Sequence, residues 1–180
     1  VVKNASPGAV VAPRGSAATR LSRWYANRHS LLFALYERLD LRKFATADDP
    51  IRMMDATSVL ASVPTVDVTP RETKFSDYFN DADVERILGY DLDVALRFGF
   101  RILRGRSLRI ARYGVWSYHH GDNLANRGGP PGFWEVIEQV PTTGSVLQIL
   151  SEDLDAGRVI YRSQARTQPL SVTKNRAGYF

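Results

Sequence analysis

The sequence predicts an α/β domain built on a largely parallel sheet. Short runs of β-branched and apolar residues alternate along the chain with segments of helical period. Such alternation is typical of parallel sheets, because parallel neighbours are joined by helical crossovers. A length of 180 residues suits one domain with a sizeable core. We expect residues 1–20 to form a loose N-terminal segment and residues 21–180 to form the α/β domain.

The N-terminal third contains two helical patterns and one short strand. Val1–Thr19 is rich in Ala, Gly, Pro and Ser and lacks a period, which predicts loose structure. Apolar residues then recur at helical intervals through Leu21–Leu41. An Asp-Pro pair at the start of residues 49–62 supplies an N-cap and a first-turn proline, which predicts a second helix. The alternating residues Pro64–Val68 predict a strand.

The middle of the chain repeats this alternation. Asp81–Leu88 is expected to be a helix, because acidic residues in its first turn stabilise the helix dipole. Leu92–Phe98 follows as a strand that ends at Gly99. Arg104–Tyr113 reads as a helix and Val115–Tyr118 as a buried strand.

The C-terminal third adds one helix and two strands. We expect a helix over Gly132–Gln139 and strands over Ser145–Leu150 and Arg158–Gln164. The tight Leu154–Gly157 connection predicts that these last two strands form an antiparallel or bent edge of the sheet.

Composition excludes several classes of protein. The chain has no cysteine, which rules out disulfides, thiolate metal sites and a cysteine nucleophile and fits a cytoplasmic protein. No apolar run reaches the roughly 20 residues that span a bilayer, so no membrane association is expected. The chain starts at Val1 instead of Met, and we expect the natural start to lie upstream.

The net charge of +5 comes mostly from arginine. The densest run lacks the interleaved aromatic residues of a base-stacking surface; it comprises Arg101, Arg104, Arg106, Arg109 and Arg112. We therefore favour a solvated arginine-rich surface over a binding surface for an anionic partner such as tRNA or a nucleotide.

A polar sequence, Ser117-Tyr118-His119-His120, closes the buried strand. Because side chains alternate along a strand, Ser117 and His119 point to one face and His120 to the other. Open α/β sheets place their ligand crevices at the C-terminal ends of such strands. This geometry selects His119 over His120 as the candidate catalytic histidine. Asp155 follows His119 by 36 residues on the Leu154–Gly157 turn.

The order of motifs from Gly114 to Gly157 resembles the catalytic domain of the folate-dependent formyltransferases. In that family a strand ends in Asn-x-His, an Arg-Gly loop leads into a helix, and a Leu-Asp-x-Gly turn returns an aspartate to the histidine. Here Ser117 stands at the asparagine position, and His119 and Asp155 match the other two. The resemblance is strongest over residues 83–164. It implies a Rossmann-like formyltransferase domain, truncated at both ends, with a mostly parallel sheet flanked by helices.

The resemblance also implies residue roles. The catalytic group would be His119, Asp155 and Ser117, with the imidazolium and the hydroxyl donating to an oxyanion. A neighbouring carboxylate keeps an imidazole protonated and can take a proton through water. The folate pocket would be built from two loops, mainly through their backbone: Phe100, Arg101, Ile102 and Leu103, then Leu150, Ser151, Glu152, Asp153 and Leu154. A substrate loop would comprise Asp122, Asn123, Arg127 and Gly128, the first two of which either contact the acceptor or simply form a turn.

The implied activity is transfer of a formyl group from 10-formyltetrahydrofolate, used as co-substrate, to an amine. The acceptor would be a small molecule such as an amino sugar nucleotide, or an aminoacyl-tRNA; Arg127-Gly128 and Trp134 favour these over the purine branch. Two alternatives stay open: a non-catalytic binding module with the same fold, and a hydrolase that passes the formyl group to water. Ser117 is compatible with a slower enzyme, a reshaped site or a lost activity. No metal is expected, since no cysteine or spaced carboxylate completes a ligand set. The sequence does not predict an oligomeric state.

Overall fold

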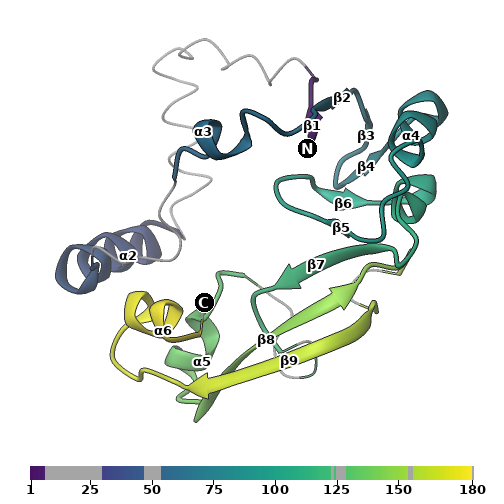
Figure 1. Cartoon of the computed structure of the whole chain (residues 1–180). Helices are drawn as coiled ribbons and strands as arrows, with labels where there is room; N and C mark the ends of the chain where they lie inside the picture. Colours follow the sequence, from purple (N-terminus) through teal and green to yellow (C-terminus); the bar gives the residue numbers. More distant parts are fainter. Residues whose placement is uncertain (7–29, 47–53, 123, 125–128, 154–155, 180) are drawn as a thin grey trace.

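The computed structural model describes residues 1–6, 30–46, 54–122, 124, 129–153 and 156–179 (Figure 1). Its strands and helices alternate along the chain, so the predicted α/β class is confirmed. Three of the six strand pairings among these residues are parallel and three are antiparallel. The antiparallel pairs lie in the long C-terminal strands and in one short hairpin.

A strand that the sequence did not predict opens the chain. β1 (Val2–Asn4) pairs in parallel with β2 (Val66–Val68), with Val2 opposite Val66. β1 therefore replaces the loose structure expected for these residues, whereas β2 confirms the predicted strand. The partners are 64 positions apart, and a pairing so distant leaves no local sequence pattern.

Helix α4 (Asp81–Leu88) has the predicted bounds. The side chain of Asn80 caps it by accepting a hydrogen bond from the backbone N–H of Asp83 at 2.8 Å. One face of α4 buries Val84 and Ile87, each 1% exposed, against a core that includes β2. Burial of this face against the sheet supplies most of the stability of so short a helix.

Beside α4 lies a small sheet in the order β3-β4-β6. β3 (Arg71–Glu72) and β4 (Ser76–Tyr78) form an antiparallel hairpin that was not predicted, and β6 (Ile102–Leu103) pairs in parallel with β4. Strands of two or three residues are too short to show the alternation that marks a strand in a sequence.

The predicted helix over Arg104–Tyr113 is wrong. The chain instead forms a five-residue 3-10 helix, Gly105–Arg109, and Gly105 has a positive φ of 66° that breaks the helical path. The arginines of this region meet carboxylates of the same chain: Arg101 pairs with Asp77 and Glu72, Arg106 with Asp81 and Glu85, and Arg112 with Asp93. These ion pairs support the solvated-surface interpretation of the arginine run.

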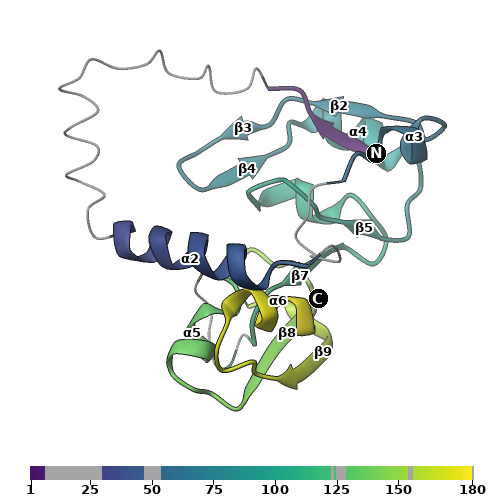
Figure 2. The same ribbon diagram turned by 90° about the vertical axis from the view of Figure 1, so that its left-hand side faces the viewer.

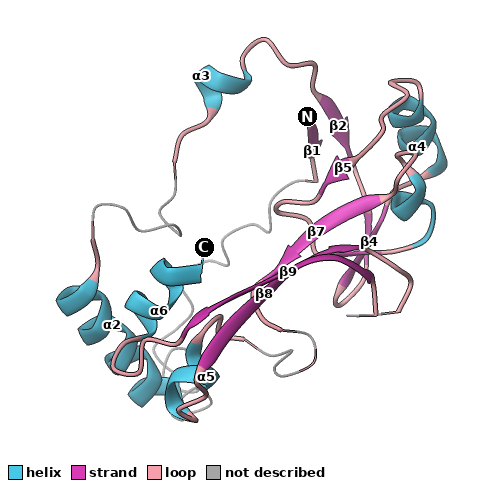
Figure 3. Cartoon of the chain, turned by 60° about the horizontal axis from the view of Figure 1, so that its bottom comes forward, coloured by secondary structure: helices cyan, strands magenta, loops and turns pink. Residues whose placement is uncertain are grey.

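The main sheet has the order β5-β7-β8-β9 (Figure 3). β5 (Ala95–Leu96) is shorter than predicted and lies parallel to β7 (Val115–His119). β8 (Thr142–Ile149) runs antiparallel to β7, and β9 (Arg158–Arg166) antiparallel to β8. The predicted antiparallel edge formed by the last two strands is confirmed.

Three helices gather at one end of the main sheet (Figure 2). α2 (Leu31–Phe44) packs on α6 (Val172–Tyr179), which the sequence did not predict, and on α5 (Phe133–Ile137). The predicted helix over 21–41 thus continues to residue 44, and its first residues lie outside the described part. Of the helix predicted over 49–62, the described residues contain α3 (Thr57–Leu60).

Hydrogen bonds hold α6 against its neighbours. A carboxylate oxygen of Asp40, in α2, accepts a hydrogen bond from the backbone N–H of Thr173 at 2.7 Å. Asn175 is 2% exposed, and its amide nitrogen donates to the carbonyl of Gly132 at 3.0 Å and to the hydroxyl of Thr143 at 2.9 Å. Its amide oxygen accepts from the backbone N–H of Gln168 at 3.0 Å. These bonds explain why a helix with little apolar surface is held at this place.

Candidate functional site

A polar row crosses three adjacent strands of the main sheet. In the parallel pair β5–β7, the backbone N–H of Arg97 donates to the carbonyl of Trp116 at 2.8 Å, which places Arg97 beside Ser117. On the other side of β7, Ser117 lies directly opposite Gln148 of β8. Residues opposite each other in neighbouring strands project to the same face of a sheet. Arg97, Ser117 and Gln148 therefore share one face.

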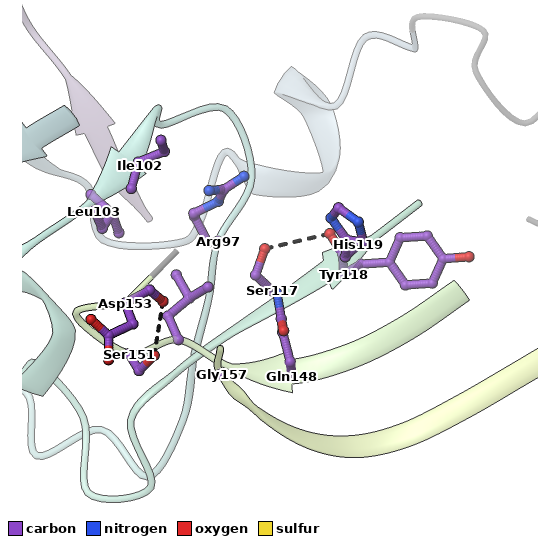
Figure 4. Close-up of a pocket in the computed structure, with 11 residues that line it drawn as sticks. Arg97, Ile102, Leu103, Ser117, Tyr118, His119, Gln148, Ser151, Asp153 and Gly157 are labelled. Carbon is purple, nitrogen blue, oxygen red and sulfur yellow. Dashed lines mark hydrogen bonds between the residues drawn. The ribbon is translucent and has the colours of Figure 1, made fainter. Parts of the chain in front are cut away.

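This face forms the floor of a pocket of about 180 Å³ (Figure 4). The polar row and His119 line it, together with Ile102 and Leu103 from β6 and the residues that follow β8. Of the residues that the resemblance assigned to catalysis and folate binding, seven meet here: Ser117, His119, Ile102, Leu103, Leu150, Ser151 and Asp153. The two loops named from the sequence thus lie on one pocket with the candidate histidine.

His119 carries a polar atom without a partner in this pocket. Its Nε2 is buried and has no hydrogen-bond partner among the described residues. The hydroxyl of Ser117, which is 4% exposed, makes a long contact of 3.4 Å with the carbonyl of Tyr118. Both the imidazole nitrogen and this weakly bonded hydroxyl can form hydrogen bonds with a ligand. A buried polar atom without a partner destabilises the fold unless a ligand forms that hydrogen bond.

His120 lies in different surroundings from His119. Its ring packs edge-on against the ring of Tyr118, with centroids 5.1 Å apart. Partial burial lowers the pKa of His120, and the positive charges of His119, Arg176 and Arg97 lower it further. His120 does not line the pocket, which agrees with the strand alternation.

Three residues predicted for the folate pocket have other contacts. Phe100 packs edge-on against Phe79 of the core, with ring centroids 5.1 Å apart. The guanidinium of Arg101 binds the carboxylate of Asp77 at 2.6 and 2.9 Å. Glu152 accepts a hydrogen bond from the backbone N–H of Gly105 at 2.9 Å and so ties the loop after β8 to the 3-10 helix. The side chains of these three residues therefore support the pocket walls.

Asp122 is the part of the predicted substrate loop whose contacts are described. Its carboxylate accepts from the backbone N–H of Leu124 at 2.9 Å and pairs with Arg162 of β9. Burial raises the pKa of Asp122, but these bonds and one from Gln164 outweigh it and hold the pKa below its usual range. Such contacts support the turn-forming role. Asn123, Arg127, Gly128, Leu154 and Asp155 lie outside the described residues.

The packing at residue 157 explains why the Leu-Asp-x-Gly motif ends in glycine. Gly157 lines the pocket, and a Cβ at this position would lie 2.3 Å from the carbonyl oxygen of Ile149 and 3.2 Å from the side-chain oxygen of Gln148. No side chain fits without displacing backbone. Glycine is therefore required for the close approach of this turn to β8.

Arg97, Tyr118 and Gln148 line the pocket but were not assigned to the site from the sequence. Arg97 interrupts the apolar strand predicted over 92–98, and Gln148 is a polar residue in the alternating strand predicted over 145–150. In the sequence, Arg97 and Gln148 stand out only as polar residues within predicted strands. The register of β5, β7 and β8 is needed to show that both lie beside Ser117.

The described residues contain no cluster of three or more side chains able to hold a metal ion. Within the same residues, no helix is both long enough and apolar enough to span a membrane.

Comparisons with known proteins find formyltransferases and a formyltetrahydrofolate deformylase among the similar proteins. A methionyl-tRNA formyltransferase of Prochlorococcus marinus (strain MIT 9515) is 29% identical over 100 residues, which are 56% of this chain and 30% of that protein. A formyltetrahydrofolate deformylase from Pseudomonas syringae pv. tomato str. DC3000 has a similar structure, with a TM-score of 0.52 and 22% identity, over 69% of this chain and 43% of its own. These similarities support the resemblance to the formyltransferase family. No family model matches it.

A third comparison extends the likeness in fold. The glycinamide ribonucleotide transformylase 1 of Symbiobacterium toebii superposes with a TM-score of 0.51 at 16% identity, over 67% of this chain and 57% of its own. The chain therefore shares the fold of these proteins, in agreement with the Rossmann-like fold that the resemblance implied. The chain spans about a third to little more than half the length of these relatives.

Proposed function

We propose that this domain transfers a formyl group from a 10-formyltetrahydrofolate-type donor to an amine acceptor, with the reaction taking place beside Ser117 and His119. The observation that carries the proposal is the buried, unpartnered Nε2 of His119, in a pocket lined by both predicted folate loops. We assign the activity to one α/β domain, residues 21–180 together with β1.

The pocket suits the reacting end of a ligand. Whole drug-sized ligands occupy about 300–1,000 Å³, so a volume of about 180 Å³ fits the donor's formyl end and part of its ring system. Ile102 and Leu103 supply an apolar wall and backbone groups, while Ser117 and His119 supply polar atoms. This division resembles that of small-molecule sites in general, which combine apolar walls with a few placed polar groups.

The side chains have the following roles in the proposed reaction. The acceptor amine attacks the formyl carbon, and negative charge develops on the formyl oxygen. Protonated His119 and the hydroxyl of Ser117 donate hydrogen bonds to that oxygen. The carbonyl then re-forms as the bond between the formyl carbon and the donor nitrogen breaks, and the donor nitrogen takes up, through water, the proton lost by the amine. Asp155, two residues before Gly157 in the sequence, keeps the imidazole protonated and removes the amine proton through water.

Hydrolysis is the second candidate reaction. The Pseudomonas syringae protein of similar fold is a formyltetrahydrofolate deformylase, and water can replace the amine in the same geometry. The two reactions differ in product: formate is released by hydrolysis, whereas transfer leaves a formylated amine. The acceptor for transfer is proposed to be an amino sugar nucleotide or an aminoacyl-tRNA.

The test is an assay of both products with the purified chain. We expect 10-formyltetrahydrofolate to be consumed, with consumption lowered by several orders of magnitude in His119→Ala and strongly lowered in Asp155→Asn. His120→Ala is the matched control, since that residue does not line the pocket. Unchanged consumption in His119→Ala contradicts the mechanism. Reduced-folate binding without either product identifies the domain as a binding module.

A further inference from the structure

Arg97 is a partly buried cation that no described side chain neutralises. Its Nε is buried and has no hydrogen-bond partner among the described residues. A terminal nitrogen donates only to the backbone carbonyl of Arg101, at 3.3 Å. In the part of the chain that the structure describes, none of the ion pairs includes Arg97.

The carboxylates near Arg97 do not offset its charge. Asp77 attracts it electrostatically, but the guanidinium of Arg101 already binds the Asp77 carboxylate at 2.6 and 2.9 Å. Asp153 lines the same pocket and forms no recorded ion pair with Arg97. A desolvated cation without a counter-charge is costly, and an anion that binds beside it recovers part of that cost.

Arg97 stands next to the candidate catalytic residues. It occupies the polar row beside Ser117, and it lines the same pocket as His119 (Figure 4). Burial lowers the pKa of the Arg97 guanidinium, and its positive charge contributes to the lowered pKa of His120. Arg97 therefore brings a positive charge to the wall of a pocket that Asp153 also lines. A guanidinium presents several N–H donors in one plane, which matches the oxygens of a carboxylate or phosphate.

We infer that Arg97 binds an oxyanion, a carboxylate or phosphate group, carried by a ligand of this pocket. Two ligands of the proposed reaction could supply it: the glutamate carboxylates of a reduced folate, or an acidic group on the amine acceptor. The inference rests on the proposed function only for the choice between these sources. Binding of a simple oxyanion depends on Arg97 alone.

The first experiment measures inorganic phosphate. Phosphate should bind the wild-type chain and raise its Tm at constant ionic strength, because a ligand specific for the native state stabilises it. Arg97→Gln should weaken phosphate binding about tenfold or more, as expected when a charged hydrogen bond is lost. Arg97→Lys should give an intermediate loss, since it keeps the charge without the planar donors. Arg112→Gln removes an exposed arginine outside the pocket and is the matched control.

The second experiment identifies the source of the oxyanion. We would titrate 5-formyltetrahydrofolate, and an analogue without the glutamate, into the wild type and Arg97→Gln. Weaker binding of only the glutamate-bearing folate assigns the oxyanion to the folate. Unchanged folate binding with weakened phosphate binding assigns it to the acceptor.

The outcomes separate this inference from the proposed function. Equal phosphate affinity in the wild type, Arg97→Gln and Arg112→Gln overturns the role of Arg97, even where folate binds normally. Absence of folate binding to every variant contradicts the folate assignment, while the phosphate result still decides the role of Arg97. Thermal melts of each variant before titration show that it is folded.

Discussion

The turn that carries the proposed catalytic aspartate leaves no room for a methyl group at Gly157. A Cβ there would lie 2.3 Å from the carbonyl oxygen of Ile149, whereas real contacts begin near 3.0 Å and become ordinary at 3.4 Å. Gly157→Ala therefore requires a displacement of 0.7 to 1.1 Å, the differences between 2.3 Å and those two limits. Asp155 precedes Gly157 by two residues, so we expect the displacement to shift the proposed catalytic carboxylate. A misplacement of about 1 Å lowers an enzymatic rate by about 10²-fold.

The assay compares 10-formyltetrahydrofolate consumption by the wild type, Gly157→Ala and Gly178→Ala. A Cβ at Gly178 meets nothing within 4 Å, so this variant controls for the chemical change itself. We expect Gly157→Ala to lose about 10²-fold in kcat and to have a lower Tm, with Gly178→Ala close to the wild type. Full activity and an unchanged Tm in Gly157→Ala refute the proposed packing of this turn.

Three further predictions concern Ser117, His120 and Asn175. Ser117→Asn should hold or raise the formyl-transfer rate, since an amide donor suits an oxyanion as the family's asparagine does; a fall of an order of magnitude contradicts this. His120→Gln should reduce the loss of stability between about pH 7.5 and about pH 5.5. The pKa of His120 is lowered in the folded chain, so the unfolded chain binds more protons as pH falls below 6.5. Proton binding then favours unfolding, and thermal melts at several pH values measure the resulting fall in Tm. Asn175→Ala should destabilise by about 2–4 kcal/mol in urea melts, because it removes three hydrogen bonds of a buried side chain, of which those to Gly132 and Thr143 are buried; a change within 0.5 kcal/mol contradicts it.

Local patterns predicted the elements whose stability depends on nearby residues. Asp81–Leu88 has an N-cap, acidic residues in its first turn and two buried apolar residues on one face, and its bounds were predicted without error. β1 and α6 depend on distant partners and were missed. β1 pairs with a strand 64 positions later, and α6 is held by bonds from Asp40 and Thr143 instead of by an apolar stripe.

The residues of the candidate site were likewise predicted only in part from the sequence. Strand alternation alone indicated that Ser117 and His119 share a face, and both line the pocket. Arg97 and Gln148 join them only through the registers of β5–β7 and β7–β8. The guanidinium of Arg101 binds Asp77, a contact that no local sequence pattern shows, and the predicted folate role of Arg101 through its backbone stays a prediction.

The bond between Asp40 and Thr173 has a consequence for synthesis of the chain. These residues are 133 positions apart, so α2 is made long before the helix on which it packs. At about 5–20 residues per second, that interval is about 7–27 s. During it Phe33 and Tyr36, which later pack around Phe133, stay in water on one side of α2, while Leu32, Leu35 and Leu39 are exposed on the other. Until these partners are made, α2 has apolar side chains uncovered on both sides, and such transiently exposed surface makes a partly synthesised chain prone to aggregate.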